Sequence, residues 1–131
     1  MHIMYDRELL ADKLSQVSDA LDRISRRFAE INSADDFLTN DHGLDMLDSI
    51  CMMLITVGEN FKAIDKMTGG TFLEHYPNIN WRGVKGVRDV IFNQYFNIDG
   101  EEIYYICSHD LEPLRSTVKK MIQAIQQKSG G

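Results

Sequence analysis

Four polar side chains that could act on a phosphate group lie close together in the chain: Arg88, Asp89, Asn93 and Tyr95. An arginine binds phosphate oxygens through a rigid fork of N–H donors, and a tyrosine hydroxyl both donates and accepts hydrogen bonds. The stretch around them, 80–100, has three basic residues before its first acidic one, although the whole chain has a net charge of −6. We therefore expect a local phosphate site in a chain whose acidity disfavours nonspecific binding of nucleic acid.

The basic residues near this group also have a regular spacing. Arg82, Lys85 and Arg88 follow one another in steps of three, which spreads them over about 120° of a helix surface. They form either a stripe that binds RNA phosphates or an ordinary solvated face. Glu59, which follows Gly58 within an expected helix, is likewise either a carboxylate at a binding cleft or a solvated residue.

The bulk composition is typical of one globular domain that covers residues 1–131. The sequence has no apolar run near the ~18 residues of a membrane span, and its N-terminus lacks the apolar core of a signal peptide. Without a disulfide framework, Cys51 and Cys107 are expected to be reduced core residues of a cytoplasmic protein. The four histidines have no metal-ligand spacing, so we expect neither a metal nor another cofactor.

Apolar residues at helical spacing predict an all-α protein, an antiparallel four-helix bundle with short extra helical turns. No segment has the alternating pattern of a strand. The turns are expected near 33–38 and 71–76. The long helices are expected at about 6–31, from Asn40 or Asp41 to Gly69, from Asn80 onward, and from Asp99 to about Gln127.

Glycine and proline positions suggest how these helices meet. Gly58 within a helix costs about 1 kcal/mol relative to alanine, which a close helix crossing or the approach of a ligand would explain. Gly83 and Gly86 keep the first turns of the third helix thin, so another backbone could come close there. Pro113 is expected to kink the fourth helix or to split it into two pieces.

Helix geometry limits what the phosphate-site residues can do together. On an ideal helix Arg88 and Tyr95 lie within about 20° of each other, whereas Asn93 is about 140° from Arg88. The three side chains therefore cannot converge on one straight helix. They could converge if the helix ends or distorts near Asn93, or if a second protomer closes the site.

The segment from Tyr76 to Leu114 resembles the signature of the HepT-like HEPN proteins, and with Val57 to Asn60 upstream the resemblance covers essentially the whole chain. It implies an all-helical HEPN-like homodimer with a cleft between the protomers. It also implies the toxin half of a toxin–antitoxin pair whose antitoxin is a minimal nucleotidyltransferase. Toxins of this family are metal-independent endoribonucleases, so the resemblance implies that RNA is the substrate.

The catalytic motif of that family has an arginine, a histidine a few residues later and a tyrosine just beyond it. Arg88 and Tyr95 match the first and last positions, and Asp89 matches the polar residue that usually follows the arginine. Asn93 occupies the histidine position. Histidine exchanges a proton near neutral pH, whereas asparagine can only donate or accept hydrogen bonds. Because acid–base catalysis typically contributes ~10²- to 10⁴-fold, we expect any ribonuclease activity to be weakened.

Three functions remain open at this stage. The first is a ribonuclease toxin weakened by Asn93. The second is a non-catalytic subunit that docks a nucleotidyltransferase and presents Tyr95 as the acceptor of a nucleotide. The third is a dimeric helical adaptor without a ligand, in which Tyr95 packs in a core or interface and Asn93 only ends a helix. Asn93 favours the second function, while Arg88, Asp89 and Tyr95 argue against the third.

Overall fold

Helices make up the architecture, and a computed structural model describes them over residues 6–93 and 98–129. The long helices are α1 (Arg7–Phe28), α2 (Asp41–Met67), α3 (Trp81–Asn93) and a continuous fourth segment. That segment consists of α4 (Gly100–Tyr105), the π-helical turn η3 (Ile106–Asp110) and α5 (Leu111–Ser129). Two 3-10 turns, η1 (Ala34–Phe37) and η2 (Leu73–His75), complete the part that is described, which contains no strand. The predicted all-α, four-helix fold is confirmed.

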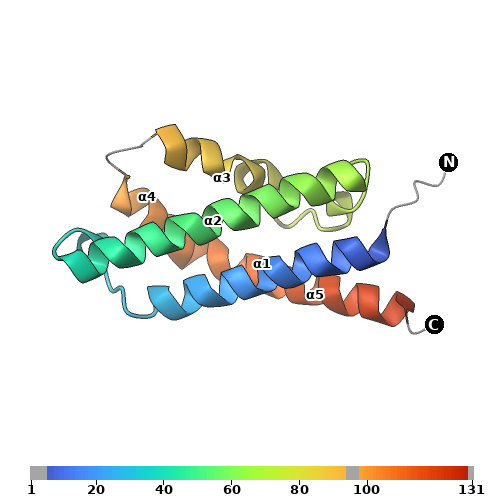
Figure 1. Cartoon of the computed structure of the whole chain (residues 1–131), viewed down its shortest axis with the longest axis horizontal. Helices are drawn as coiled ribbons and strands as arrows, with labels where there is room; N and C mark the ends of the chain where they lie inside the picture. The colour runs from blue at the N-terminus through green and yellow to red at the C-terminus, as the bar shows by residue number, and fades with distance from the viewer. Residues whose placement is uncertain (1–5, 94–97, 130–131) are drawn as a thin grey trace.

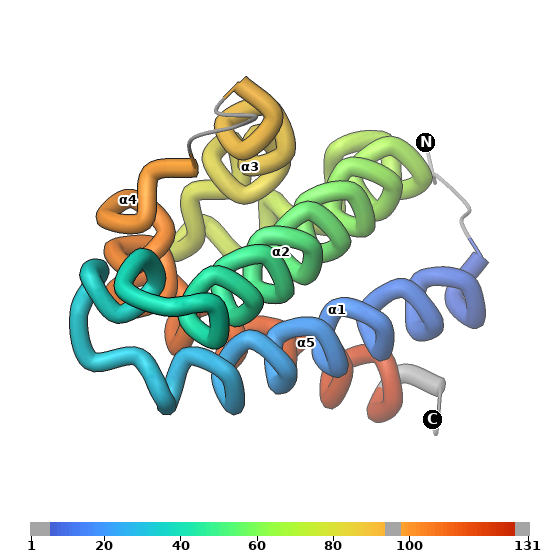
Figure 2. The backbone as a smooth tube through the Cα atoms, turned by 60° about the vertical axis from the view of Figure 1, so that its left-hand side comes forward, coloured from blue at the N-terminus to red at the C-terminus, as the bar shows by residue number. Residues whose placement is uncertain are grey.

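The helices pack as an elongated antiparallel bundle (Figure 1). Helix α1 lies between α2 and α5, while α3 packs along the other side of α2 (Figure 2). The fourth segment runs beside α1, and its first turns contact η1. Among the described residues, no helix is both long and apolar enough to cross a membrane.

Side-chain caps fix where the helices begin. Asp6, Asn40, Asn80 and Asp99 each accept a hydrogen bond from a backbone N–H group in the first turn that follows, at 2.8–3.3 Å. Such caps satisfy N–H groups that have no partner within the helix. The four predicted helix starts are thus confirmed. Helix α2 ends where Gly69 and Gly70 adopt positive φ, a conformation that glycine adopts without strain.

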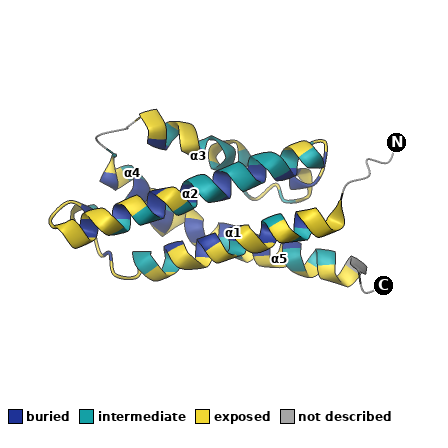
Figure 3. Cartoon of the chain, viewed as in Figure 1, coloured by how far each residue is buried: buried dark blue, intermediate teal, exposed yellow. Residues whose placement is uncertain are grey.

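One continuous core fills the space between the helices, and the buried positions follow their inward faces (Figure 3). The apolar stripe predicted for α1 is buried from Leu10 to Ile24. The stripe predicted for α2 is buried except at Leu44, which is 40% exposed, because the first turn of α2 projects past the end of α1 (Figure 1). Cys51 and Cys107 are free and buried, as predicted.

The fourth helical segment accommodates Pro113 without a break. A proline lacks the backbone N–H group, and its ring crowds the carbonyl group one turn earlier. The five-residue π turn η3 ends directly before the turn that holds Pro113. A π turn shifts the backbone register by one residue, and we infer that this shift makes room for the ring. The sequence predicted a kink or a split at Pro113, and the structure instead has a π turn within one continuous helical segment.

Gly58 lies where α2 crosses α3. A Cβ atom on Gly58 would be 2.8 Å from the carbonyl oxygen of Val84 and 2.9 Å from Cγ1 of Val87. The close crossing predicted at Gly58 is confirmed. A Cβ atom on Gly86 would meet nothing within 4 Å, and the nearest atoms to one on Gly83 would be those of the Asn80 side chain. The close backbone approach predicted at those two glycines does not occur among the described residues.

Candidate functional site

Arg88 lies on the outer side of α3, beside α2. Its Nη1 atom is 3.3 Å from Oε1 of Glu59, and its side chain remains 49% exposed. The same Glu59 oxygen is 3.6 Å from Nζ of Lys62. Glu59 is therefore a direct partner of the arginine, and the tight packing at the neighbouring Gly58 brings the two helices close enough for this contact.

An aromatic ring holds Arg88 from a second direction. The guanidinium carbon lies 5.0 Å from the ring centroid of Phe92, one turn further along α3, within the range of a cation–π interaction. Exposed ion pairs contribute only about 0–1 kcal/mol. An incoming phosphate could therefore replace Glu59 at small cost, while Phe92 still limits where the guanidinium can go.

The basic stripe on α3 is partly neutralised. Nζ of Lys85 is 2.7 Å from Oδ2 of Asp65 on α2, and both side chains are partly buried. Arg82 is exposed. Two of the three predicted RNA-binding residues thus pair with carboxylates of α2, and only a ligand with a strong negative charge would compete for them.

Asp89 and Asn93 are both exposed on α3, which remains helical as far as Asn93. Over five residues of regular helix, Asn93 turns about 140° away from Arg88 and lies about 7.5 Å further along the axis. The structure therefore does not bring Arg88 and Asn93 together within one chain. Tyr95 lies outside the described residues.

A cavity is next to this site but does not include it. About 470 Å³ of space separates α3 from the fourth helical segment, lined mainly by apolar side chains such as Val87, Val90 and Leu111. Of the candidate residues that the structure describes, none lines this cavity. Arg88 instead extends toward Glu59 on α2, and a single chain leaves its guanidinium half-exposed.

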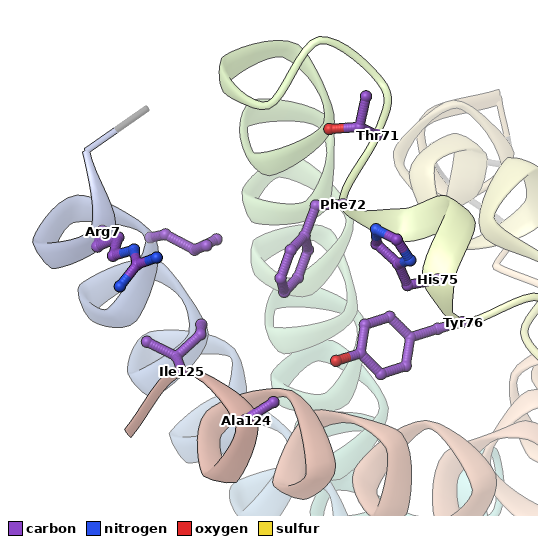
Figure 4. Close-up of a pocket in the computed structure, with 8 residues that line it drawn as sticks. Arg7, Thr71, Phe72, His75, Tyr76, Ala124 and Ile125 are labelled. Carbon is purple, nitrogen blue, oxygen red and sulfur yellow. The ribbon is translucent and has the colours of Figure 1, made fainter. Parts of the chain in front are cut away.

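A smaller cavity of about 290 Å³ lies at the other end of the bundle. Figure 4 shows the guanidinium of Arg7 and the hydroxyl of Tyr76 directed toward it from different elements, and its apolar lining includes Phe72 and Ile125. No candidate residue contributes to it.

His109 lies on the fourth helical segment, and its contacts among the described residues are local. Its ring stacks on Tyr105 at 4.1 Å, and its Nδ1 atom lies 3.1 Å from the Tyr105 carbonyl oxygen and 3.0 Å from Oγ of Ser108. All these contacts belong to its own helical segment. Within the described ranges, no three His, Cys, Asp or Glu side chains are grouped so that they could hold a metal ion.

The family model of HepT-like ribonucleases matches residues 17–121, which include every candidate residue. The chain belongs to the HepT-like ribonuclease family. The family resemblance noted in the sequence is thereby confirmed. As a HepT-like ribonuclease family member, the chain carries Arg88 and its neighbours in the C-terminal half of the matched region.

Two proteins of Methanocaldococcus jannaschii are similar to this HepT-like chain. They are named "Putative RNase MJ0125" and "Putative RNase MJ1216", and they are 25% and 26% identical to it over 80 residues. These alignments cover 61% of this chain, and 66% and 63% of the two relatives, which is just under two thirds of their length. No solved structure matches the chain.

Sequence reasoning identified Glu59 as a candidate but missed Phe92. Phe92 follows Arg88 by four residues, a spacing that places two side chains together on a helix, so this contact could have been predicted. The pairing of Lys85 with Asp65 could not, because it depends on how α2 and α3 are aligned in space.

Proposed function

We propose that this protein is a metal-independent endoribonuclease of the HepT-like toxin type, acting on RNA in the cytoplasm. The observation that carries the proposal is the half-exposed Arg88 guanidinium on α3, within the region matched by the ribonuclease family. We propose residues 1–131 as one domain that acts without a cofactor.

In this proposal Arg88 binds the phosphate at which the RNA strand breaks. Its N–H groups stabilise the negative charge that develops there, and Asp89 and Tyr95 contribute hydrogen bonds nearby. Arg82 and Lys85 bind neighbouring phosphates. Asn93 can position a hydroxyl group but exchanges no proton near neutral pH, so the activity is weakened.

A homodimer is part of the same proposal. Arg88 and Asn93 point in different directions on α3, and Arg88 faces open solvent rather than the large cavity. A two-fold axis beside α3 would bring two copies of this surface together, so that Arg88 of one protomer and Asn93 of the other could act on one phosphate. Light scattering that shows a strict monomer at micromolar concentration would contradict this arrangement.

Cleavage of a structured RNA in EDTA tests the catalytic proposal. The wild type should cut slowly, and Asn93→His should raise the rate because a titratable group returns to the motif. Arg88→Ala should abolish cleavage, whereas Arg26→Ala, which removes an exposed arginine from α1, should not. Strong wild-type cleavage that Asn93→His leaves unchanged would show that position 93 has no catalytic role.

The presence of asparagine at position 93 also favours a second function. In it the protein is a non-catalytic subunit that binds a minimal nucleotidyltransferase antitoxin and presents Tyr95 as nucleotide acceptor. Failure of both the wild type and Asn93→His to cut RNA, together with a stable complex with that partner, would support this second function.

A further inference from the structure

Phe92 is exposed on α3, whereas two nearby apolar residues of the same helix are buried. Its side chain is 48% exposed, whereas Val87 and Ile91 on the same helix are 8% and 5% exposed. The ring therefore contributes little to the core. Single apolar residues are common on protein surfaces, so exposure alone assigns no role to Phe92. Its position beside Arg88 does.

We propose that the ring of Phe92 stacks against an unpaired base of the RNA whose phosphate Arg88 binds. This inference rests on the proposed function and specifies its substrate as single-stranded RNA. The guanidinium of Arg88 lies 5.0 Å from the ring centroid, so the groups that would bind a phosphate and a base are adjacent on one face of α3. A nucleotide likewise carries its phosphate and its base side by side.

The chemistry of RNA recognition supports this pairing. Proteins bind unpaired RNA by stacking its bases on aromatic rings and arginine planes, and this stacking tolerates different bases. In a duplex each base is already stacked and paired, so its faces are closed to a side chain. A surface made of Arg88 and Phe92 should therefore prefer loops and single strands over a continuous helix.

Tyr105 provides a matched comparison within the same molecule. It is also an exposed aromatic residue, at 57%, and it too carries a stacked neighbour, His109. It lies on the fourth helical segment and has no arginine over its ring among the contacts described. Removal of the Tyr105 ring tests whether any exposed aromatic residue of this protein contributes to RNA binding.

The experiment measures binding of a single-stranded 2′-O-methyl RNA, which cannot be cleaved through its 2′ position, with 2-aminopurine as a base whose fluorescence falls on stacking. Phe92→Leu should weaken binding about 5- to 150-fold, the range that corresponds to ~1–3 kcal/mol for one stacked base, and should abolish the quenching. Phe92→Trp should retain both. Tyr105→Leu should bind as the wild type does, and a duplex of the same sequence should bind weakly and be insensitive to Phe92→Leu.

Several outcomes would overturn the stacking role. One is wild-type affinity and quenching in a folded Phe92→Leu protein. Another is an equal loss in Tyr105→Leu, which would make the effect nonspecific. A third is a Phe92→Leu protein with altered oligomeric state but unchanged quenching, which would place the ring against a second copy of the chain. If Phe92→Leu binds normally while Arg88→Ala abolishes cleavage, stacking fails but the proposed function stands. A wild type that neither binds nor cuts RNA refutes both.

Discussion

Gly58 and Val84 meet at the crossing of α2 and α3, where a methyl group on Gly58 would lie 2.8 Å from the carbonyl oxygen of Val84. This contact sets the distance between the two helices at the level of the candidate site. The residue after Gly58 is Glu59, the partner of Arg88. The absence of a side chain at Gly58 therefore sets the helix spacing beside the Glu59–Arg88 pair.

Substitution of Gly58 should show this directly. Gly58→Ala should destabilise the protein by about 1–3 kcal/mol, because the new methyl group meets a backbone atom that cannot move alone, and this outweighs the ~1 kcal/mol gained in helix propensity. Gly86→Ala is the control, since a Cβ atom there meets nothing within 4 Å, and it should be neutral or slightly stabilising. Urea denaturation measures both variants. Equal stability of the two would mean that the crossing is not tight.

Glu59→Gln should tighten RNA binding several-fold. The change keeps the size of the side chain but removes the charge that competes with phosphate for Arg88. The loss of an exposed ion pair should lower the folding stability by less than about 1 kcal/mol. Asp48→Asn, which removes an exposed charge from the same helix, is the control and should have a smaller effect on binding. Weaker RNA binding in Glu59→Gln would instead show that Glu59 orients Arg88 for its ligand.

Tyr95 should accept a nucleotide if the protein is paired with a minimal nucleotidyltransferase. Incubation with that enzyme and ATP should add one or more AMP units to the intact mass, and Tyr95→Phe should prevent the addition. An attached AMP would add negative charge and bulk, and in the proposed site it would compete with RNA for Arg88 without refolding. Modification that persists in Tyr95→Phe would point to Tyr105, which is exposed, before Tyr104, whose hydroxyl donates to the carbonyl oxygen of Asn32 at 3.0 Å.

The two cysteines should be unreactive while the protein is folded. Burial raises the pKa of the Cys51 thiol, and likewise that of Cys107, from 9.0 to about 12, so almost no thiolate exists at pH 8. A colorimetric thiol reagent should modify neither cysteine until denaturant is added. Rapid labelling of the folded protein would contradict their burial.

The same shifts predict a loss of stability in alkali. Well below pH 9 both thiols are protonated in the folded and the unfolded chain, so their titration does not change the free energy of unfolding. As the pH rises from 9 toward 12, the unfolded chain releases these protons and the folded protein does not, so stability falls. Urea denaturation of the wild type and of Cys51→Ala/Cys107→Ala across this range should show the shallower decline in the double variant.

The parts of the structure that depend on residues close together in the sequence could be predicted from the sequence. Asp6 and Asn80 cap their helices through a few local atoms, and the glycine in α2 implied a close crossing before its partner was known. The other features depend on how the helices are placed relative to one another in the folded chain. The pairing of Glu59 with Arg88 needs α2 and α3 in register, and the exposure of Leu44 depends on where α1 ends. The local pattern placed Asn93 in a predicted phosphate site, and only the family resemblance aligned it with a catalytic histidine.

The placement of α3 has a consequence for how the molecule fluctuates. Helix α3 packs mainly along α2, and the 470 Å³ cavity lies among α3, α2 and the fourth helical segment. Detaching α3 therefore breaks fewer buried contacts than separating α1 from α2, and subglobal openings start where such contacts are few. Backbone amides of α3 should exchange with solvent deuterium earlier than those of α1. We therefore expect the helix that carries Arg88 to open while the remaining helices stay folded.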